Sequence, residues 1–188
     1  MMTFVNMDSE GLVILPTHRV VFGLGNLKSE QFVQNCLPFF KVEQAANTQV
    51  PALMNRLAQV QGQNVFAAVF PDSTVFLITR PETIAMGLNG VSARQRQLDV
   101  VQLHQIVLEH VLKISQDAIR EQRNVRYLRS ADEAVAEVHS GKADVAFLMN
   151  PVRLDQMRDI AFAGEVMPQK STDFYPKLLS GLAGYALE

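Results

Sequence analysis

The sequence predicts an α/β or α+β fold in which a mixed β-sheet is flanked by helices. Three observations support this prediction. Short runs rich in β-branched and aromatic residues alternate along the chain with segments of helical periodicity. Two of these runs are separated by a short turn, which is typical of a β-hairpin. Later in the chain a strand, a short helix and a strand follow one another closely, as in a parallel βαβ unit.

Extended structure opens the chain. The apolar run GLVILP is bounded by Gly11 and Pro16, and RVVFGLG follows it closely, so both are predicted to be strands. The next segment, residues 29–37, carries apolar side chains at helical spacing, and Ser29 is the expected cap of this helix.

The hairpin lies in the middle of the chain. The runs NVFAAVF and TVFLITR are separated by residues 71–73, whose sequence Pro-Asp-Ser favours a turn. Before them, FFKVEQ is predicted as a brief strand and residues 50–62 as a helix that ends at a glycine.

A long amphipathic helix is predicted next, with Asp99 as its cap. Its apolar side chains recur at i, i+3, i+7 and i+11, and polar side chains share the opposite side. The apolar positions are Val100, Leu103, Val107 and Val111, and the polar positions are Gln102, Gln105 and Glu109.

The predicted βαβ unit and one further helix complete the second half. The strands NVRYLR and ADVAFLM enclose a helix that begins after Ser130 and ends at Gly141. The last helix is expected over residues 151–164, with a proline in its first turn.

Composition limits both the size of the fold and its partners. A chain of 188 residues, 48% hydrophobic, is long enough for one good core, so a single domain is expected, with residues 1–97 and 98–188 as the halves of a two-lobed alternative. The net charge of -2 supplies no basic field for nucleic acid. The single cysteine, Cys36, suits a reducing compartment, and no signal peptide or membrane span is recognisable, which predicts a cytoplasmic protein.

The histidines of the long helix are interpreted as structural. His104 and His110 are six positions apart, which turns them about 240° away from each other on a helix, so they do not share a metal ion. His104 falls in the apolar stripe and is interpreted as a buried, hydrogen-bonded side chain. No metal site is predicted.

Two irregular segments carry the candidate site residues. In PTHRVV, His18 and Arg19 follow a strand, where Arg supplies donors for phosphate and His exchanges protons near neutral pH. In MPQKSTDFYPKLLSG, Lys170 supplies a charge, and Ser171 and Thr172 supply hydroxyls and N–H groups for a phosphate. The second segment lacks the glycines of a P-loop, and a C-terminal strap packed on the core explains it equally well.

Four segments resemble the C-terminal half of a large prokaryotic family, the domain of unknown function DUF-1015. They are NMDSEGLVILPTHRVV, LDVVQLHQIVLEHVL, GKADVAFLMNP and AGEVMPQKSTDFYPKLLSG. The resemblance implies a distant relation to free-serine kinases, whose upstream Asp-Gly-His-His-Arg motif does not occur in this chain. It implies that His18, Arg19, Lys170, Ser171 and Thr172 contribute phosphate or nucleotide contacts to a small-molecule kinase that uses ADP or ATP with Mg²⁺ in the full-length parent, whereas this chain alone is inactive.

A second hypothesis assigns no nucleotide to this chain. It describes a non-catalytic scaffold or small-ligand sensing domain that docks on an N-terminal domain of the full-length protein through the same two segments. The sequence determines neither the identity of the substrate nor whether the chain forms a homo-oligomer. Neither nucleic acid nor a membrane is expected as a partner. Because both segments flank elements of one core, residues 17–19 and 169–172 are predicted to lie close together.

Overall fold

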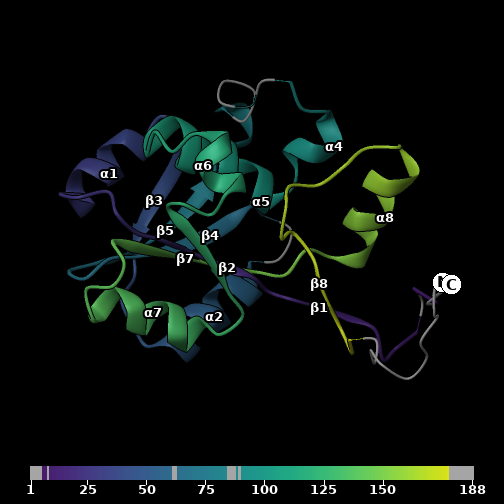
Figure 1. Ribbon diagram of the computed structural model, residues 1–188, viewed down its shortest axis with the longest axis horizontal. Helices are drawn as coiled ribbons and strands as arrows, with labels where there is room; N and C mark the ends of the chain where they lie inside the picture. The colour runs from purple at the N-terminus through teal and green to yellow at the C-terminus, as the bar shows by residue number, and fades with distance from the viewer. Residues whose placement is uncertain (1–5, 8, 61–62, 84–87, 89, 178–188) are drawn as a thin grey trace, which may run out of the picture.

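The computed structural model describes residues 6–7, 9–60, 63–83, 88 and 90–177. It confirms the predicted α/β class, because a six-stranded sheet has helices on both faces and a two-stranded sheet beside it (Figure 1). The strands are β1 Val13–Leu15, β2 His18–Val21, β3 Phe40–Gln44, β4 Val65–Val69, β5 Thr74–Thr79, β6 Val125–Leu128, β7 Val145–Met149 and β8 Asp173–Tyr175. The helices are α1 Ser29–Cys36, α2 Val50–Gln59, η1 Pro81–Thr83, α4 Ala93–Arg96, α5 Asp99–Gln102, η2 Leu103–Val111, α6 Gln116–Arg120, α7 Ala131–His139 and α8 Leu154–Phe162.

The larger sheet has the strand order β3-β5-β4-β7-β2-β6, and its pairings within the described residues are antiparallel. The hairpin of β4 and β5 forms as predicted. The predicted βαβ unit takes a split form: β6 and β7 run parallel to each other, but β2 lies between them and is antiparallel to both. The prediction of parallel hydrogen bonds between β6 and β7 is therefore wrong, because β2, from the start of the chain, occupies the central position.

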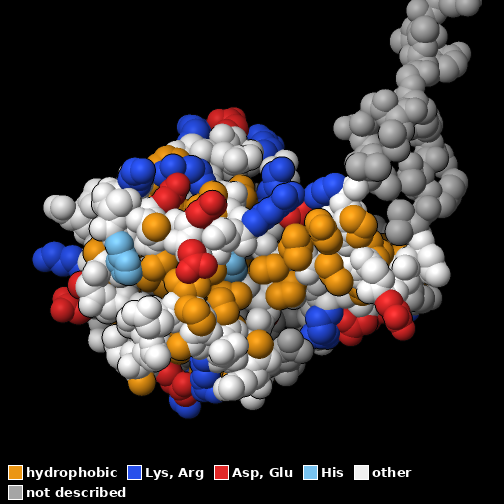
Figure 2. Space-filling view, turned by 90° about the horizontal axis from the view of Figure 1, so that it is seen from below, with side chains coloured by type: hydrophobic (Ala, Val, Ile, Leu, Met, Phe, Trp, Pro, Cys, Tyr) orange, Lys and Arg blue, Asp and Glu red, His pale blue; other side chains and the backbone are white. Residues whose placement is uncertain are grey.

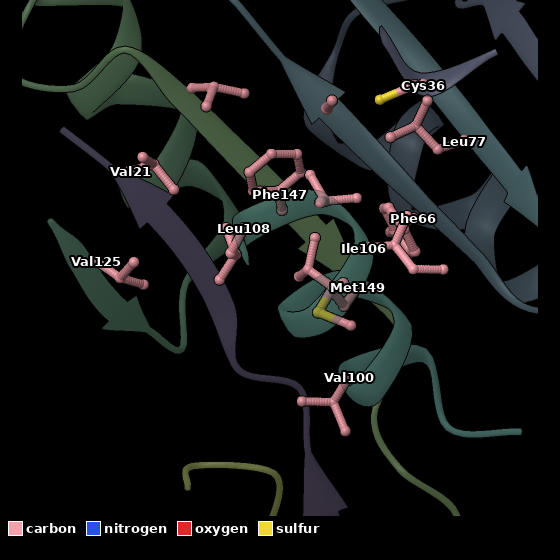
Figure 3. Close-up of a cluster of buried hydrophobic side chains, with 14 of the residues drawn as sticks. Val21, Cys36, Phe66, Leu77, Val100, Ile106, Leu108, Val125, Phe147 and Met149 are labelled. Carbon is pink, nitrogen blue, oxygen red and sulfur yellow. The ribbon is translucent and has the colours of Figure 1, made fainter. Parts of the chain in front are cut away.

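Each face of the sheet has its own hydrophobic core. Residues of α1, η2 and α6 pack with the sheet in one core, which includes Phe66, Leu108 and Phe147 (Figure 3). Residues of α2 and α7 pack on the opposite face. Side chains alternate between the faces along a strand, so Val21 belongs to the first core and Val20 to the second.

Helix starts differ in detail from the predictions. Ser130 caps α7 as expected, because its hydroxyl accepts a backbone N–H of that helix at 3.2 Å. Ser29 is instead the first residue of α1, and its hydroxyl donates to Asp72 at 2.8 Å. Asp99 is likewise the first residue of α5 rather than its cap, and α8 begins at Leu154 rather than at residue 151.

The predicted long helix changes type along its length. Its first turn, α5, is α-helical, and η2 continues it for nine residues as a π-helix. Gln102, expected on a polar side, is fully buried at the junction, where its amide donates to the carbonyl of Arg96 at 2.7 Å and accepts from the hydroxyl of Thr79. π-Helices are rare and mostly occur as single-turn bulges, so the length of η2 is an unusual feature of this fold.

The small sheet stands at one side of the molecule and exposes apolar side chains. β1 and β8 pair antiparallel, with Val13 opposite Tyr175. These two side chains are 43% and 56% exposed. Figure 2 shows a group of hydrophobic side chains on the side where Figure 1 places this sheet. Among the described residues, no helix is long and apolar enough to cross a membrane.

Candidate functional site

The two segments that the sequence singled out lie side by side. The PTHR segment, residues 16–19, runs from β1 into β2, and the MPQKST segment, residues 167–172, runs into β8. Nη2 of Arg19 donates a hydrogen bond to the backbone carbonyl of Lys170 at 3.0 Å. The predicted proximity of residues 17–19 and 169–172 is therefore confirmed, and we call this contact region the Arg19 centre.

Strand geometry separates the two basic residues of PTHR. His18 and Arg19 are consecutive in β2, so their side chains leave opposite faces of the sheet. Arg19 lies opposite Phe147 of the first core, whereas Leu128, which lies opposite His18, packs against the second core. The structure therefore does not bring His18 and Arg19 into one pocket.

His18 holds two strands together. It is 1% exposed, and its Nδ1 accepts the backbone N–H of Met149 in β7 at 3.2 Å. Burial, and secondarily the charge of Arg19, lower the pKa of His18 to about 4. The ring is therefore neutral at pH 7 and its Nδ1 is occupied, which suits a structural role better than proton transfer.

Arg19 is buried and binds backbone oxygens. It is 2% exposed, and its Nη1 donates to the carbonyl of Thr17 and to the Met149 sulfur at 3.5 Å. Its guanidinium also lies 5.4 Å from the centre of the Tyr127 ring. Burial lowers the pKa of Arg19 to about 10, so the group keeps its charge at pH 7.

The charge of Arg19 has no acidic partner in the described part of the chain. No ion pair involves it there, and its Nε is buried without a hydrogen-bond acceptor. Two carbonyl dipoles and an aromatic face stabilise the cation instead. Such an arrangement anchors the MPQKST segment to β2.

The MPQKST segment presents Lys170 to solvent. Lys170 has a φ of 58°, a left-handed conformation that is uncommon for residues other than glycine. Its carbonyl binds Arg19, whereas its side chain is exposed and makes no ion pair or hydrogen bond within the described ranges. Ser171 is 8% exposed and donates its hydroxyl to the carbonyl of Pro168 at 2.5 Å, which closes the turn. Thr172 is half-buried beside it.

The space at the Arg19 centre is small. A cavity of about 20 Å³ is lined by Thr17, Arg19, Asp99 and Ser171, among others, and this volume holds about one water molecule. A phosphate group therefore does not fit beside Arg19 in this conformation. Of the five predicted contact residues, only Lys170 and Thr172 make no side-chain hydrogen bond within the described residues.

Asp99 was predicted only as a helix cap, yet it lies between two cavities. It borders the small cavity and a neighbouring one of about 240 Å³. Burial raises the pKa of Asp99 to about 6, although the hydrogen bond that Asn64 donates to it at 2.5 Å acts to lower this pKa. An acidic residue at a helix start is the only sequence signal, and it does not distinguish this position from an ordinary cap.

The chain belongs to the family described as "Protein of unknown function (DUF1015)", whose model matches residues 1–101. The matched range contains PTHR. MPQKST lies beyond it, so the family resemblance of that segment stays a prediction. A comparison with curated proteins found no match.

Solved structures share this fold at low sequence identity. A free serine kinase in complex with AMP matches with a TM-score of 0.52 and 14% identity, covering 90% of this chain and 56% of that chain. A conserved hypothetical protein from Pyrococcus furiosus matches with a TM-score of 0.50 and 14% identity, covering 90% and 59%. The chain therefore spans less than two thirds of the length of these structures, and the likeness shows a common fold.

Proposed function

We propose that this chain is part of a small-molecule kinase of the free-serine type and that it contributes phosphate contacts to a nucleotide site. The observation that carries the proposal is the exposed Lys170 side chain on a backbone that the buried and charged Arg19 anchors through the Lys170 carbonyl. The fold that the chain shares with a free serine kinase in complex with AMP supports a nucleotide as the ligand.

The geometry assigns different roles to the five candidate residues. Lys170 supplies the charge that contacts a phosphate oxygen, and Thr172 supplies a hydroxyl donor beside it. Arg19 is a positioning residue, because its donors are turned to backbone oxygens. Ser171 fixes the turn, and His18 joins two strands.

The proposed reaction is phosphoryl transfer from ADP or ATP to the hydroxyl group of a small molecule. Such catalysis depends mostly on positioning and charge stabilisation, which an anchored lysine supplies. Among the described residues, no group of three or more His, Cys, Asp or Glu side chains is placed to hold a metal ion. The proposal therefore uses only the protein's own groups, and the chain alone is expected to show no turnover of free serine with ADP or ATP.

Isothermal titration of the chain with ADP tests the role of Lys170. Lys170→Met keeps the apolar stem and removes the charge, so the dissociation constant is expected to rise by at least about tenfold, because a charge-assisted hydrogen bond contributes about 1.5 to 3 kcal/mol. Lys142→Met, at another exposed lysine, is the matched control and should leave the constant unchanged. Equal affinities of Lys170→Met and the unmodified chain, with both folded, would refute the phosphate contact.

A scaffold function is the second candidate, and a separate observation favours it. The exposed pair Val13 and Tyr175 on the small sheet, together with Phe162 at 84% exposure, leaves apolar surface uncovered. The occupant proposed for this surface is the domain that makes up the rest of the longer kinase structures. Tyr175→Ser should weaken association with that domain, supplied as a separate chain, and unchanged association would count against docking at this sheet.

A further inference from the structure

An open cavity of about 370 Å³ lies between η2, α6 and the start of the MPQKST segment. Apolar side chains, including Val101, Ile119 and Met167, line part of its wall. Polar side chains line the rest, among them the amides of Gln105 and Gln169. Small-molecule sites in proteins typically combine a volume of this order with apolar walls and a few polar groups.

His104 gives this cavity a buried polar group. It is 7% exposed and lines the cavity, and its Nε2 has no hydrogen-bond partner within the described residues. The interpretation of His104 as a buried side chain is confirmed, but no hydrogen bond to its ring is found there. Burial, and secondarily Arg19, lower the pKa of His104 to about 3, so the ring is neutral at pH 7.

The charges around the cavity disfavour an anion. Asp117 and Arg120 pair with each other at 2.7 Å and cancel. Glu109 is half-buried, and within the described residues it accepts a hydrogen bond only from the neutral amide of Gln116, at 2.9 Å. One negative charge is therefore left unbalanced among the side chains that line the cavity, which repels a phosphate and leaves uncharged ligands unaffected.

We propose that this cavity is a second binding site, for an uncharged nitrogen heterocycle of the nucleobase or nucleoside class. Such a ring has flat faces for the apolar walls and alternating donors and acceptors on its edge. A glutamine amide presents a donor and an acceptor side by side, which matches that edge. The π-helix places His104 and Gln105 together at the cavity. The site is separate from the phosphate contact of Lys170 and does not depend on it.

Titration of the chain with adenosine, followed by amide chemical shifts, tests the proposal. Adenosine should shift the amides of residues 104–109, and Gln105→Leu should weaken binding about tenfold, the effect of one lost hydrogen bond. Gln49→Leu, at an exposed glutamine before α2, is the matched control and should bind normally. Absence of adenosine binding, or normal binding by folded Gln105→Leu, would overturn the proposal.

Titration with AMP tests whether the unbalanced negative charge weakens binding of a phosphate, and it distinguishes this cavity from the proposed phosphate contact at Lys170. AMP should bind the cavity at least about fivefold more weakly than adenosine, and Glu109→Gln should reduce that difference because it removes the unbalanced charge. Equal binding of AMP and adenosine by the unmodified chain would contradict the charge argument. Lys170→Met should not affect adenosine, so loss of the ADP contact and loss of this site are distinguishable.

Discussion

Acidification is expected to destabilise the protein through two buried histidines. The pKa values of His18 and His104 are about 4 and about 3 in the folded state, against 6.5 for an unperturbed histidine. The unfolded chain therefore binds protons below pH 6.5 that the folded chain does not accept. The stabilisation is complete above pH 6.5 and is lost progressively as the pH falls toward these lower values.

The size of the loss follows from the shifts. Between pH 7 and pH 5 each histidine lowers the free energy of unfolding by about 2 kcal/mol, since each is almost completely buried. Asp99 acts in the opposite direction because its raised pKa of about 6 lets the folded state take up a proton first. Over the same range Asp99 raises the free energy of unfolding by about 1 kcal/mol, so a net loss of roughly 2 to 3 kcal/mol is expected.

Urea unfolding at pH 7, 6 and 5 measures this loss. His104→Leu should remove about half of the histidine contribution, whereas His139→Leu should leave the pH dependence unchanged because His139 is exposed. A free energy of unfolding that stays constant from pH 7 to pH 5 would refute the reasoning, because it would mean that neither ring is held neutral by burial.

Three further substitutions test individual contacts by urea unfolding at pH 7. Arg19→Lys keeps the charge but cannot reach both carbonyls, so a loss of about 1.5 to 3 kcal/mol is expected, and no loss would contradict the anchoring role. Phe147→Ala should cost about 3 to 5 kcal/mol because this ring is fully buried in the first core, and a loss below 1 kcal/mol would contradict that placement. Ser130→Ala should cost about 1 kcal/mol through its lost cap, and unchanged stability would show that the cap contributes little.

The order of helices and strands is predictable from local patterns in this chain. Apolar runs, turn residues and the Ser130 cap mark the elements because each depends on residues close together in the sequence. Strand order is different. The position of β2 between β6 and β7 joins residues more than 100 positions apart, and no local pattern in the βαβ segment distinguishes adjacent strands from split ones.

The sequence predicted where the candidate site lies, but not what each of its residues does. The two irregular segments do meet, but the alternation of β2 turns His18 away from Arg19. The burial of Arg19 was not predictable, since an arginine after a strand is ordinarily exposed. The π-helix was also missed, because apolar residues at i, i+3 and i+7 are typical of an α-helix.

The central claim is that the MPQKST segment contacts the phosphate of a nucleotide. The most direct measurement is the change in backbone amide chemical shifts when ADP is added to the chain, compared with the change caused by adenosine. We expect shifts at residues 170–172 with ADP that adenosine does not produce and that Lys170→Met abolishes. ADP-dependent shifts that leave residues 170–172 unaffected would contradict the claim.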